Sequence, residues 1–267
     1  MSKLSKLKHK ILVWVFTYIY NHPSWVQLFE SIRTKKNGQK VFDLYQGEVQ
    51  LGPFKGTQIP ISAVNKAPDF GANLILGTYE QQILDFVCEK PWDVLLNIGA
   101  AHGWYGVTLL RKKIVKKVYF FESDAQLHPI IREFASTNDV SDGIEILGHA
   151  DENFLSLLYG VPLANETLVI LDVEGGETSL LNHENIFALS KCHLVIELHE
   201  FTPQMSDECN DLILRLQKYF EISIIDGLTR VVPQGIEIKG VTNLDLHNLT
   251  FEFRPNAMRW LKCKPKG

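Results

Sequence analysis

Titratable residues follow two apolar runs in the second half of the chain, at the points where both runs end. Asp172 and Glu174 come directly after residues 168–171, and His199 follows residues 194–198. Ligands of open α/β sheets bind at the carboxyl ends of the strands, so we expect these three side chains to flank one cleft. A base within about 2.6 to 3.2 Å of a hydroxyl group can take its proton as the oxygen reacts. We predict His199 as the first candidate base and Asp172 as the second, with Glu174 beside them.

Other interpretations of these residues stay open. Asp172 and Glu174 precede a helix expected near residue 176, where they could cap its N-terminus, because the helix dipole favours anions there. His199 could be a strand-end histidine that is hydrogen-bonded to backbone. Carboxylates and imidazole also suit Mg, Mn or Zn, and the candidate ligands would be Asp172, Glu174, Glu197, His199 and Glu200. We predict that no metal is bound.

A glycine-containing turn follows the apolar run at residues 93–98. Glycines stand at positions 99, 103 and 106, ahead of a segment with helical spacing. A dinucleotide site requires Gly-x-Gly-x-x-Gly, in which the second glycine lets the backbone approach a pyrophosphate. Here Ala101 and Trp104 occupy the second and third glycine positions. The turn therefore favours a cofactor without phosphates, such as S-adenosyl-L-methionine, over a nicotinamide dinucleotide.

An acidic residue stands at the end of the next apolar run. Glu122 follows residues 118–121 and lies 23 residues after Gly99. This is close to the spacing at which a carboxylate accepts hydrogen bonds from both hydroxyls of a ribose. The turn and Glu122 together predict a nucleoside-binding pocket, and a nicotinamide-dependent oxidoreductase stays an alternative that the missing glycines oppose.

The elements that must position these residues alternate along the chain beyond Thr78. Apolar runs of strand length alternate with amphipathic segments of helix length, which is the pattern of repeated βα units around a parallel sheet. Thr78 and Gln81 have capping-box spacing, so a helix is expected just before the first strand. We predict strands at 93–98, 117–122, 144–148, 167–172, 193–198, 221–226 and 258–263.

The first 76 residues have a different pattern. Two helices are expected within residues 1–37, and Asn37-Gly38 predicts a turn after them. Short alternating stretches between residues 40 and 62 predict small strands. We therefore divide the chain into an N-terminal helical extension at 1–37, an ancillary β element at 38–76, and a main domain at 77–267.

The apolar run at residues 11–20 is about half the length of roughly 20 residues that crosses a bilayer. Its basic flank and aromatic residues would suit peripheral contact with a membrane. Packing of residues 1–37 as a lid against the main domain is the interpretation that we favour.

Charge and cysteine content limit the classes of partner. Residues 1–40 hold eight Lys/Arg and one acidic residue, whereas the remainder holds 19 Lys/Arg and 30 acidic residues. An acidic body would repel a phosphate backbone, so we predict no nucleic-acid partner. The four cysteines contain no Cys-x-x-Cys pair, so they predict free thiols in the cytoplasm instead of a zinc site or a disulfide framework.

Several of these segments resemble motifs of the FkbM-like methyltransferases, which use S-adenosyl-L-methionine. The resemblance covers roughly residues 77–200, with weaker similarity at 52–56 and 252–261. It is carried by Gly77-Thr-Tyr-Glu80, Asn97-Ile-Gly-Ala-Ala-His-Gly-Trp-Tyr105, Phe121-Glu122, Leu171-Asp-Val-Glu-Gly-Gly-Glu177 and Ile196-Glu-Leu-His-Glu200. The resemblance implies a doubly wound α/β fold with a mostly parallel, seven-stranded, Rossmann-like methyltransferase sheet.

The resemblance also implies roles for individual residues. Glu122 would hold the ribose and Asp151 the adenine amino group, while the methionine portion would lie along the turn, at Asn97, Gly99, Ala101 and Gly103. Two departures stand out, because Asn97 replaces the usual acidic residue and His102 occupies a position that is often acidic. An asparagine can still donate and accept hydrogen bonds.

Together these features predict an O-methyltransferase that acts on a sugar, a glycan precursor or another small hydroxylated metabolite. A protein that keeps the fold and binds ligands or partners without turnover is the alternative, suggested by Asn97 and the apolar N-terminal segment.

Overall fold

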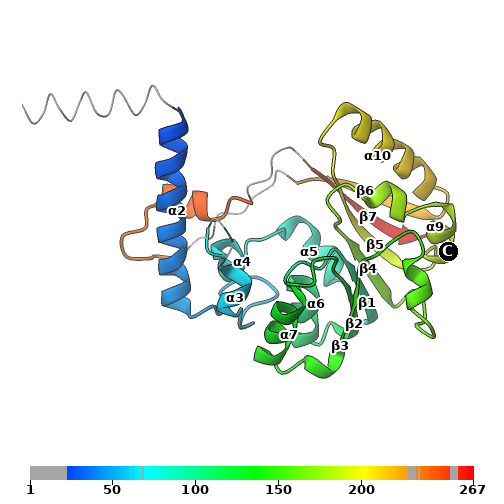
Figure 1. Cartoon of the computed structure of the whole chain (residues 1–267), viewed down its shortest axis with the longest axis horizontal. Coiled ribbons are helices and arrows are strands. Elements are labelled where there is room, and N and C mark those ends of the chain that lie inside the picture. The colour runs from blue at the N-terminus through cyan, green and yellow to red at the C-terminus, as the bar shows by residue number, and fades with distance from the viewer. Residues whose placement is uncertain (1–22, 66, 68, 228–232, 234, 253–257) are drawn as a thin grey trace, which may run out of the picture.

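A seven-stranded sheet forms the centre of the protein (Figure 1). The computed structural model describes residues 23–65, 67, 69–227, 233, 235–252 and 258–267; side chains at 23–27, 29 and 30 are outside this description. The sheet order is β3-β2-β1-β4-β5-β7-β6, and β7 runs antiparallel to both of its neighbours. The strands are β1 (Trp92–Ile98), β2 (Val115–Phe121), β3 (Ile144–Gly148), β4 (Thr167–Leu171), β5 (His193–Leu198), β6 (Phe220–Asp226) and β7 (Arg259–Pro265).

This order is that of a doubly wound fold. From β1 the chain first adds β2 and β3 on one side, then returns to add β4 and β5 on the other, and all of these pairs are parallel. All seven predicted strands are confirmed, and in β1, β4 and β5 the runs of mostly buried residues are visible as apolar segments in the sequence. The predicted Rossmann-like methyltransferase sheet is likewise confirmed.

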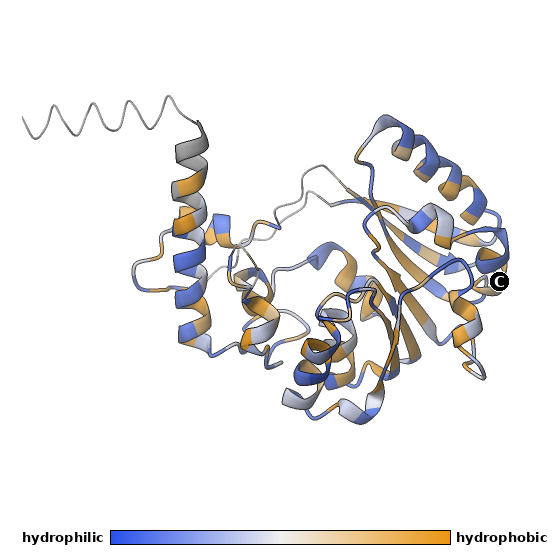
Figure 2. Ribbon diagram, in the orientation of Figure 1, coloured by the Kyte–Doolittle hydropathy of each residue, from blue (hydrophilic) through white to orange (hydrophobic). Residues whose placement is uncertain are grey.

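Helices cover both faces of the sheet. On β1, Leu95 packs into the apolar cluster on one face, while Leu96 packs into the cluster on the other, as the two-residue period of a strand requires. Figure 2 shows the strands as largely hydrophobic between more polar helices. One cluster includes residues of α5 (Gln81–Val87), α6 (Trp104–Arg111) and α7 (His128–Thr137), and the other includes residues of α8 (Glu177–Leu180), α9 (His183–Ala188) and α10 (Pro203–Leu216). Two short 3-10 helices lie at Ser141–Gly143 and Phe154–Leu157.

Four further helices lie at the α5 and α6 side of the molecule (Figure 1). Helix α2 packs against α4 and α11, and α3 packs against α7. Arg33 of α2 forms an ion pair with Asp245 of α11, with Nε 2.6 Å from Oδ1. Their bounds are α2 (Pro23–Tyr45), α3 (Ile61–Val64), α4 (Ala72–Leu76) and α11 (Asn243–Leu249).

Helix α2 contradicts two predictions. The turn at Asn37-Gly38 is wrong, and so is the first of the small strands expected between residues 40 and 62, at residues 41–45, because one helix runs from Pro23 through to Tyr45. Gly38 lies inside this helix where it passes the backbone of Asp69, and a Cβ there would be 1.7 Å from the Asp69 carbonyl oxygen. The glycine therefore marks a close approach of two chain segments, and tertiary packing overrides the local turn signal.

Of the other predictions for the region before β1, the helix is confirmed and the small strands are wrong. The ancillary β element contains one isolated bridge, between Glu48 and Gln58, instead of strands. The helix before the first strand is confirmed as α5, but Thr78 does not cap it, since the cap position is Glu80 and makes no side-chain cap bond. The expected helix around residues 11–20 lies outside the described residues, and the three-part division of the chain stays a prediction.

Two smaller findings bear on the earlier expectations. All four cysteines are free, as predicted. Among the described residues, no helix combines the length and the apolar content that crossing a membrane requires.

The close approach at Gly38 predicts an inverted mutational effect. Glycine-to-alanine changes inside helices usually stabilise by about 0.5 to 1 kcal/mol, but Gly38→Ala should lower the free energy of unfolding by about 2 kcal/mol, because the added methyl group overpacks against Asp69. Urea denaturation measures the change. Lys35→Ala, at an exposed position of the same helix, is the control and should be neutral or slightly stabilising. A more stable Gly38→Ala protein would contradict the packing described here.

Candidate active site

A cavity of about 510 Å³ lies at the carboxyl ends of β1, β2 and β4. This is the edge at which open α/β sheets bind ligands. Six predicted site residues line it, namely Gly99, Ala101, Glu122, Asp151, Asp172 and Glu174. Gly103, Asn97 and His199 are not in its lining. The structure therefore brings most of the predicted cofactor site and part of the predicted catalytic site to one place.

The turn after β1 is held between the ends of β2 and β4. The backbone N–H groups of Gly99 and Ala100 donate to the carbonyl oxygen of Phe121 at 2.9 and 3.0 Å. A Cβ on Gly99 would lie 1.6 Å from the carbonyl oxygen of Asp172, and the residue has a φ of +79°. Ala101 has a φ of +47° although it is not glycine, a conformation that is costly for residues with a Cβ. The turn thus has one shape, fixed by its neighbours.

Glu122 connects the end of β2 to this turn. Its Oε2 accepts the N–H of Ala101 at 2.7 Å, and its Oε1 accepts the N–H of Asp124 at 2.7 Å. The side chain lines the cavity and is 8% exposed. Because each carboxylate oxygen can accept more than one hydrogen bond, both remain able to accept from a diol. The backbone bonds fix the orientation of the carboxylate in the cavity wall.

Asn97 and Asp151 occupy different environments. Asn97, on β1, is 2% exposed, and its Oδ1 has no hydrogen-bond partner among the described residues. Asp151 is exposed, lines the cavity, and accepts the N–H of Asn153 at 2.7 Å. A buried polar atom without a partner is uncommon in a finished site, so Asn97 fits a position that a ligand or water completes.

The imidazole of His199 lies against carboxylates of residues 172–177, the segment that follows β4. Its Nδ1 is 2.6 Å from Oε1 of Glu177, and the same oxygen accepts the N–H of Gly175 at 3.1 Å. Its Nε2 is 3.5 Å from Oδ1 of Asp172 and 3.3 Å from Oε2 of Glu174. The three predicted catalytic residues are therefore in mutual contact, and Glu177 holds the imidazole from its other side.

This surrounding determines the charge of His199. Burial by itself disfavours the imidazolium, but the hydrogen bond to Glu177 and the charges of Asp172 and Glu174 outweigh it and raise the pKa of His199 above its ordinary value of 6.5. The ring is 2% exposed, whereas the Glu174 side chain is 79% exposed. A buried imidazolium is thus connected to solvent through an exposed carboxylate.

The structure bears on two alternative roles of these residues, helix capping and metal binding. Capping of α8 by Asp172 or Glu174 is wrong, since Gly176 is the cap position and no side chain caps it. Glu200 lies in a separate ion pair, with Oε1 2.6 Å from Nη2 of Arg259. Ligand-type atoms of Asp172, Glu174 and His199 do lie within 4.8 Å of one another, as do those of Glu80, Asp172 and Glu197. The absence of a metal stays a prediction.

Glu80, whose carboxylate lies near those of Asp172 and Glu197, was not identified from the sequence as a site residue. Glu80, at the start of α5, is 1% exposed and accepts a short hydrogen bond from the hydroxyl of Tyr105 on α6. Its backbone N–H donates to Oε1 of Glu252 at 2.9 Å. Glu80 reaches the carboxylates of Asp172 and Glu197 from 92 or more residues away in the sequence, so no spacing rule could have found it; its place in the Gly77-Thr-Tyr-Glu80 motif was the available signal.

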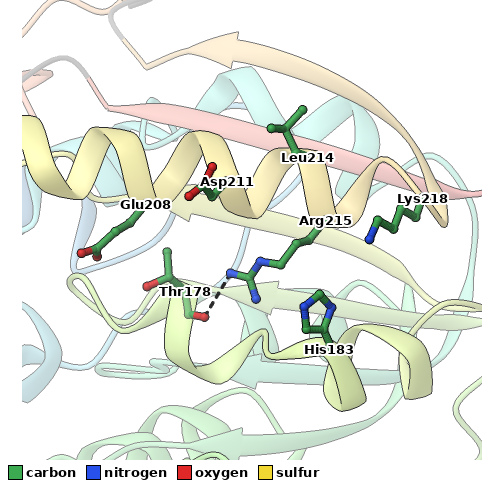
Figure 3. Close-up of a pocket in the computed structure, with 7 residues that line it drawn as sticks. All are labelled: Thr178, His183, Glu208, Asp211, Leu214, Arg215 and Lys218. Atoms are coloured by element: carbon green, nitrogen blue, oxygen red, sulfur yellow. Dashed lines mark hydrogen bonds between the residues drawn. The ribbon is translucent and has the colours of Figure 1, made fainter.

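A second depression, of about 550 Å³, lies between α10 and the α8–α9 segment and contains none of these residues (Figure 3). Arg215 of α10 donates to the carbonyl oxygens of Leu181 at 2.7 Å and Thr178 at 3.3 Å. Figure 3 shows the guanidinium turned toward Thr178. The side chain fastens α10 to α8, so this depression is a groove between packed helices.

The fold is similar to that of solved methyltransferases, whereas no family model and no curated protein matches the sequence. An rRNA methylase from Streptococcus thermophilus is 14% identical, with a TM-score of 0.48 and coverage of 69% of this chain and 95% of that one. A precorrin-6y C5,15-methyltransferase from Geobacter metallireducens is 10% identical, with a TM-score of 0.45 and coverage of 70% and 90%.

A third similar structure is Sp1610 from Streptococcus pneumoniae, whose name assigns it to tRNA (m1A22) methylation, in complex with S-adenosyl-L-methionine. It is 13% identical, with a TM-score of 0.43 and coverage of 69% and 72%. At these identities the similarity concerns the fold.

The prediction that the protein has no nucleic-acid partner, which was based on the net charge of residues 41–267, is wrong. Enzymes named for rRNA and tRNA methylation share this fold, so the fold does not separate nucleic-acid substrates from small ones. Net charge sums over the whole surface, whereas a binding face depends on where charges lie. An acidic body therefore does not decide the class of substrate.

The contacts of His199 predict its titration. Its pKa in the folded protein should lie above 6.5, and Glu177→Gln should lower it, because the strongest stabilising contact of the imidazolium is lost. The stabilisation from this charge is present below pH 6.5 and disappears as the pH rises through the pKa of the folded state. NMR titration of the histidine ring signals, assigned with His199→Gln, measures the value. Glu184→Gln, at an exposed position of α9, should leave it unchanged; a His199 pKa below 6.5 in the unmodified protein would contradict the arrangement.

Proposed function

We propose that the protein is an S-adenosyl-L-methionine-dependent O-methyltransferase related to the FkbM-like group. The observation that carries the proposal is Glu122, whose carboxylate is fixed by two backbone N–H groups at 2.7 Å in the wall of the cavity beside the turn after β1. This is the position and the chemistry that a ribose diol requires. The sequence resemblance, which includes Glu122, points to the same cofactor.

The charge of the cavity separates the candidate cofactors. Its described lining includes five carboxylates and no Lys or Arg; the acids are Glu122, Asp151, Glu152, Asp172 and Glu174. A pyrophosphate would be repelled there, whereas a cofactor with a positively charged sulfonium and ammonium group is attracted. The cavity thus favours S-adenosyl-L-methionine over a nicotinamide dinucleotide, in agreement with the missing second and third glycines.

In this assignment the turn from Asn97 through Gly99, Ala101 and Gly103 holds the methionine portion, Glu122 the ribose, and Asp151 the adenine amino group. Asn97 lies outside the cavity lining, and its unpartnered Oδ1 is a buried acceptor at the start of the turn that a water can fill. When bound, S-adenosyl-L-methionine supplies a methyl group on a positively charged sulfur, which leaves as a neutral thioether once an oxygen has taken the methyl.

His199, Asp172 and Glu174 would handle the proton of the acceptor hydroxyl. Glu177 fixes the Nδ1 side of the imidazole, which leaves Nε2 as the atom that accepts a proton. The raised pKa means that the neutral form predominates only when the pH exceeds that value, so turnover should increase with pH through the His199 pKa. Glu174, exposed to solvent and 3.3 Å from Nε2, can pass the proton to water.

The acceptor class follows from the resemblance and the presence of candidate bases: a sugar, a glycan precursor or a small hydroxylated metabolite. The four free cysteines support a cytoplasmic location. Leu28 and Ile32, which are 49% and 56% exposed and one helical turn apart on α2, would let this helix touch a membrane surface.

Calorimetric titration with S-adenosylhomocysteine tests the cofactor assignment without knowledge of the acceptor. The unmodified protein should bind, and Glu122→Ala should weaken binding by roughly 10- to 100-fold, because two charge-assisted hydrogen bonds to the ribose are lost. Glu145→Ala, on the exposed edge strand β3, is the control with the same change of charge. Absence of binding to the unmodified protein would instead favour a binding or scaffold protein that keeps the fold without the chemistry.

The catalytic assignment predicts a second effect once an acceptor is available. His199→Gln should lower kcat by about 10²- to 10⁴-fold, the usual contribution of a general base, with little change in the affinity for S-adenosylhomocysteine. The residual rate should lose the rise with pH that the unmodified protein shows. Rates and pH profiles within threefold of the unmodified protein would remove His199 from the mechanism.

A further inference from the structure

A second cavity, of about 350 Å³, lies on the other side of the turn after β1. It is formed where the segment that contains α3 and α4 meets the start of α7 and the turn itself. Its apolar lining comes from Ala63, Ala67, Leu74, Leu127 and Ile130. The volume falls within the range of small-molecule sites, and a mostly apolar wall with few polar groups is typical of them.

The two cavities meet at one residue. Ala101 lines both the cofactor cavity and the second cavity, and its backbone N–H is bonded to Glu122 at 2.7 Å. A ligand in the second cavity would therefore lie one residue away from a cofactor held by Glu122. This proximity is what a methyl acceptor needs, because transfer requires the reacting atoms to approach within about 3 to 3.5 Å.

His102 is the polar residue in this wall whose partner is missing. Neither ring nitrogen makes a hydrogen bond to another described residue, and Nε2 is fully covered. Burial lowers the pKa of His102 to about 4, so the ring is neutral at pH 7. The other polar side chains of the wall are not free: Ser62 donates to Glu133, Asp69 accepts from Gly71 and Asn73, Asn73 accepts from Leu74, and Glu252 accepts from Glu80. Tyr79, which also lines the cavity, is not without a partner either.

A neutral imidazole selects a particular group on a ligand. It carries one N–H donor and one acceptor nitrogen, and a hydroxyl group can pair with either, since it donates and accepts. Two carboxyl groups, those of Asp69 and Glu252, also line the cavity, whereas its described lining contains no Lys or Arg. Such a wall disfavours phosphate and other anions.

We propose that this second cavity binds the acceptor, and that the acceptor is a small uncharged compound with an apolar ring and a hydroxyl group held by His102. The proposal rests on the proposed function, and it narrows the acceptor class from polar glycans toward hydroxylated ring compounds without phosphate. A second hydroxyl oxygen of the acceptor, the one that reacts, extends past Ala101 into the cofactor cavity, while His102 holds the hydroxyl on the ring.

Phenol is a suitable probe, because it has an apolar ring, one hydroxyl group and no charge at pH 7. We would titrate the full chain with phenol by NMR, with and without S-adenosylhomocysteine, and expect a dissociation constant of about 1 mM. His102→Phe keeps the ring and removes the nitrogens, and should weaken phenol binding roughly five- to tenfold. Ala63→Trp fills the cavity and should abolish binding. Phenyl phosphate should bind at least tenfold more weakly than phenol.

Calorimetry with S-adenosylhomocysteine on the same variants separates the two proposals. Ala63→Trp, which lies outside the turn after β1, should bind it as the unmodified protein does, which also shows that this variant is folded. Circular dichroism checks the fold of His102→Phe, because His102 lies within that turn. If S-adenosylhomocysteine binds but phenol does not, or phenol binds Ala63→Trp and the unmodified protein equally, the acceptor cavity is wrong and the cofactor site stands. Equal binding of phenyl phosphate would overturn the proposed class and favour a phosphorylated acceptor. Failure of S-adenosylhomocysteine to bind the unmodified protein contradicts the proposed function itself.

Discussion

The contact between the backbone of Gly99 and the carbonyl group of Asp172 is the constraint on which the site depends. A side chain at position 99 would meet this oxygen at 1.6 Å, and the N–H of Asp172 bonds to the carbonyl of Ile98 at 2.9 Å. The ends of β1 and β4 are thereby locked together. The turn after β1 therefore contacts Glu122, and the segment after β4 contacts His199. The groups proposed to bind the cofactor and those proposed to accept a proton thus lie at the same edge of the sheet.

How much of this the sequence could predict depends on the range of the interactions involved. The central strands β1, β4 and β5 were predictable, because five or six consecutive buried residues leave an apolar run in the sequence. The helix that begins at Pro23 was predicted, but its continuation to Tyr45 was not, because Asn37-Gly38 is a strong local turn signal and the reason for a glycine there lies 31 residues away, at Asp69. The contact of Tyr105 with Glu80 was likewise inaccessible, since a motif places its own residues and gives no information about which distant side chain meets them.

The net charge of the chain is less informative than the positions of individual charged residues. The acidic total of the body suggested that nucleic acid was excluded, and this inference failed because net charge sums over the whole surface and does not say where the charges lie. The cavities are a different case, since their carboxylates are located. The acids in the cofactor cavity and the two carboxyl groups in the second cavity act over a few ångströms, where Coulomb interactions are strong and poorly screened. Local charge therefore supports conclusions about ligands that net charge cannot.

The surroundings of His199 create a conflict that a catalytic role must resolve. The carboxylates of Asp172, Glu174 and Glu177 stabilise the imidazolium that forms when a proton is accepted, but the same charges keep the ring protonated beforehand and reduce the fraction that can act as a base. A buried imidazolium without an exit for its proton would be a structural ion pair. Glu174 changes this, because it is mostly exposed and lies 3.3 Å from Nε2. In the proposed mechanism the base acts at pH values above its raised pKa and returns its proton through Glu174, whose backbone is left-handed with φ of +53°.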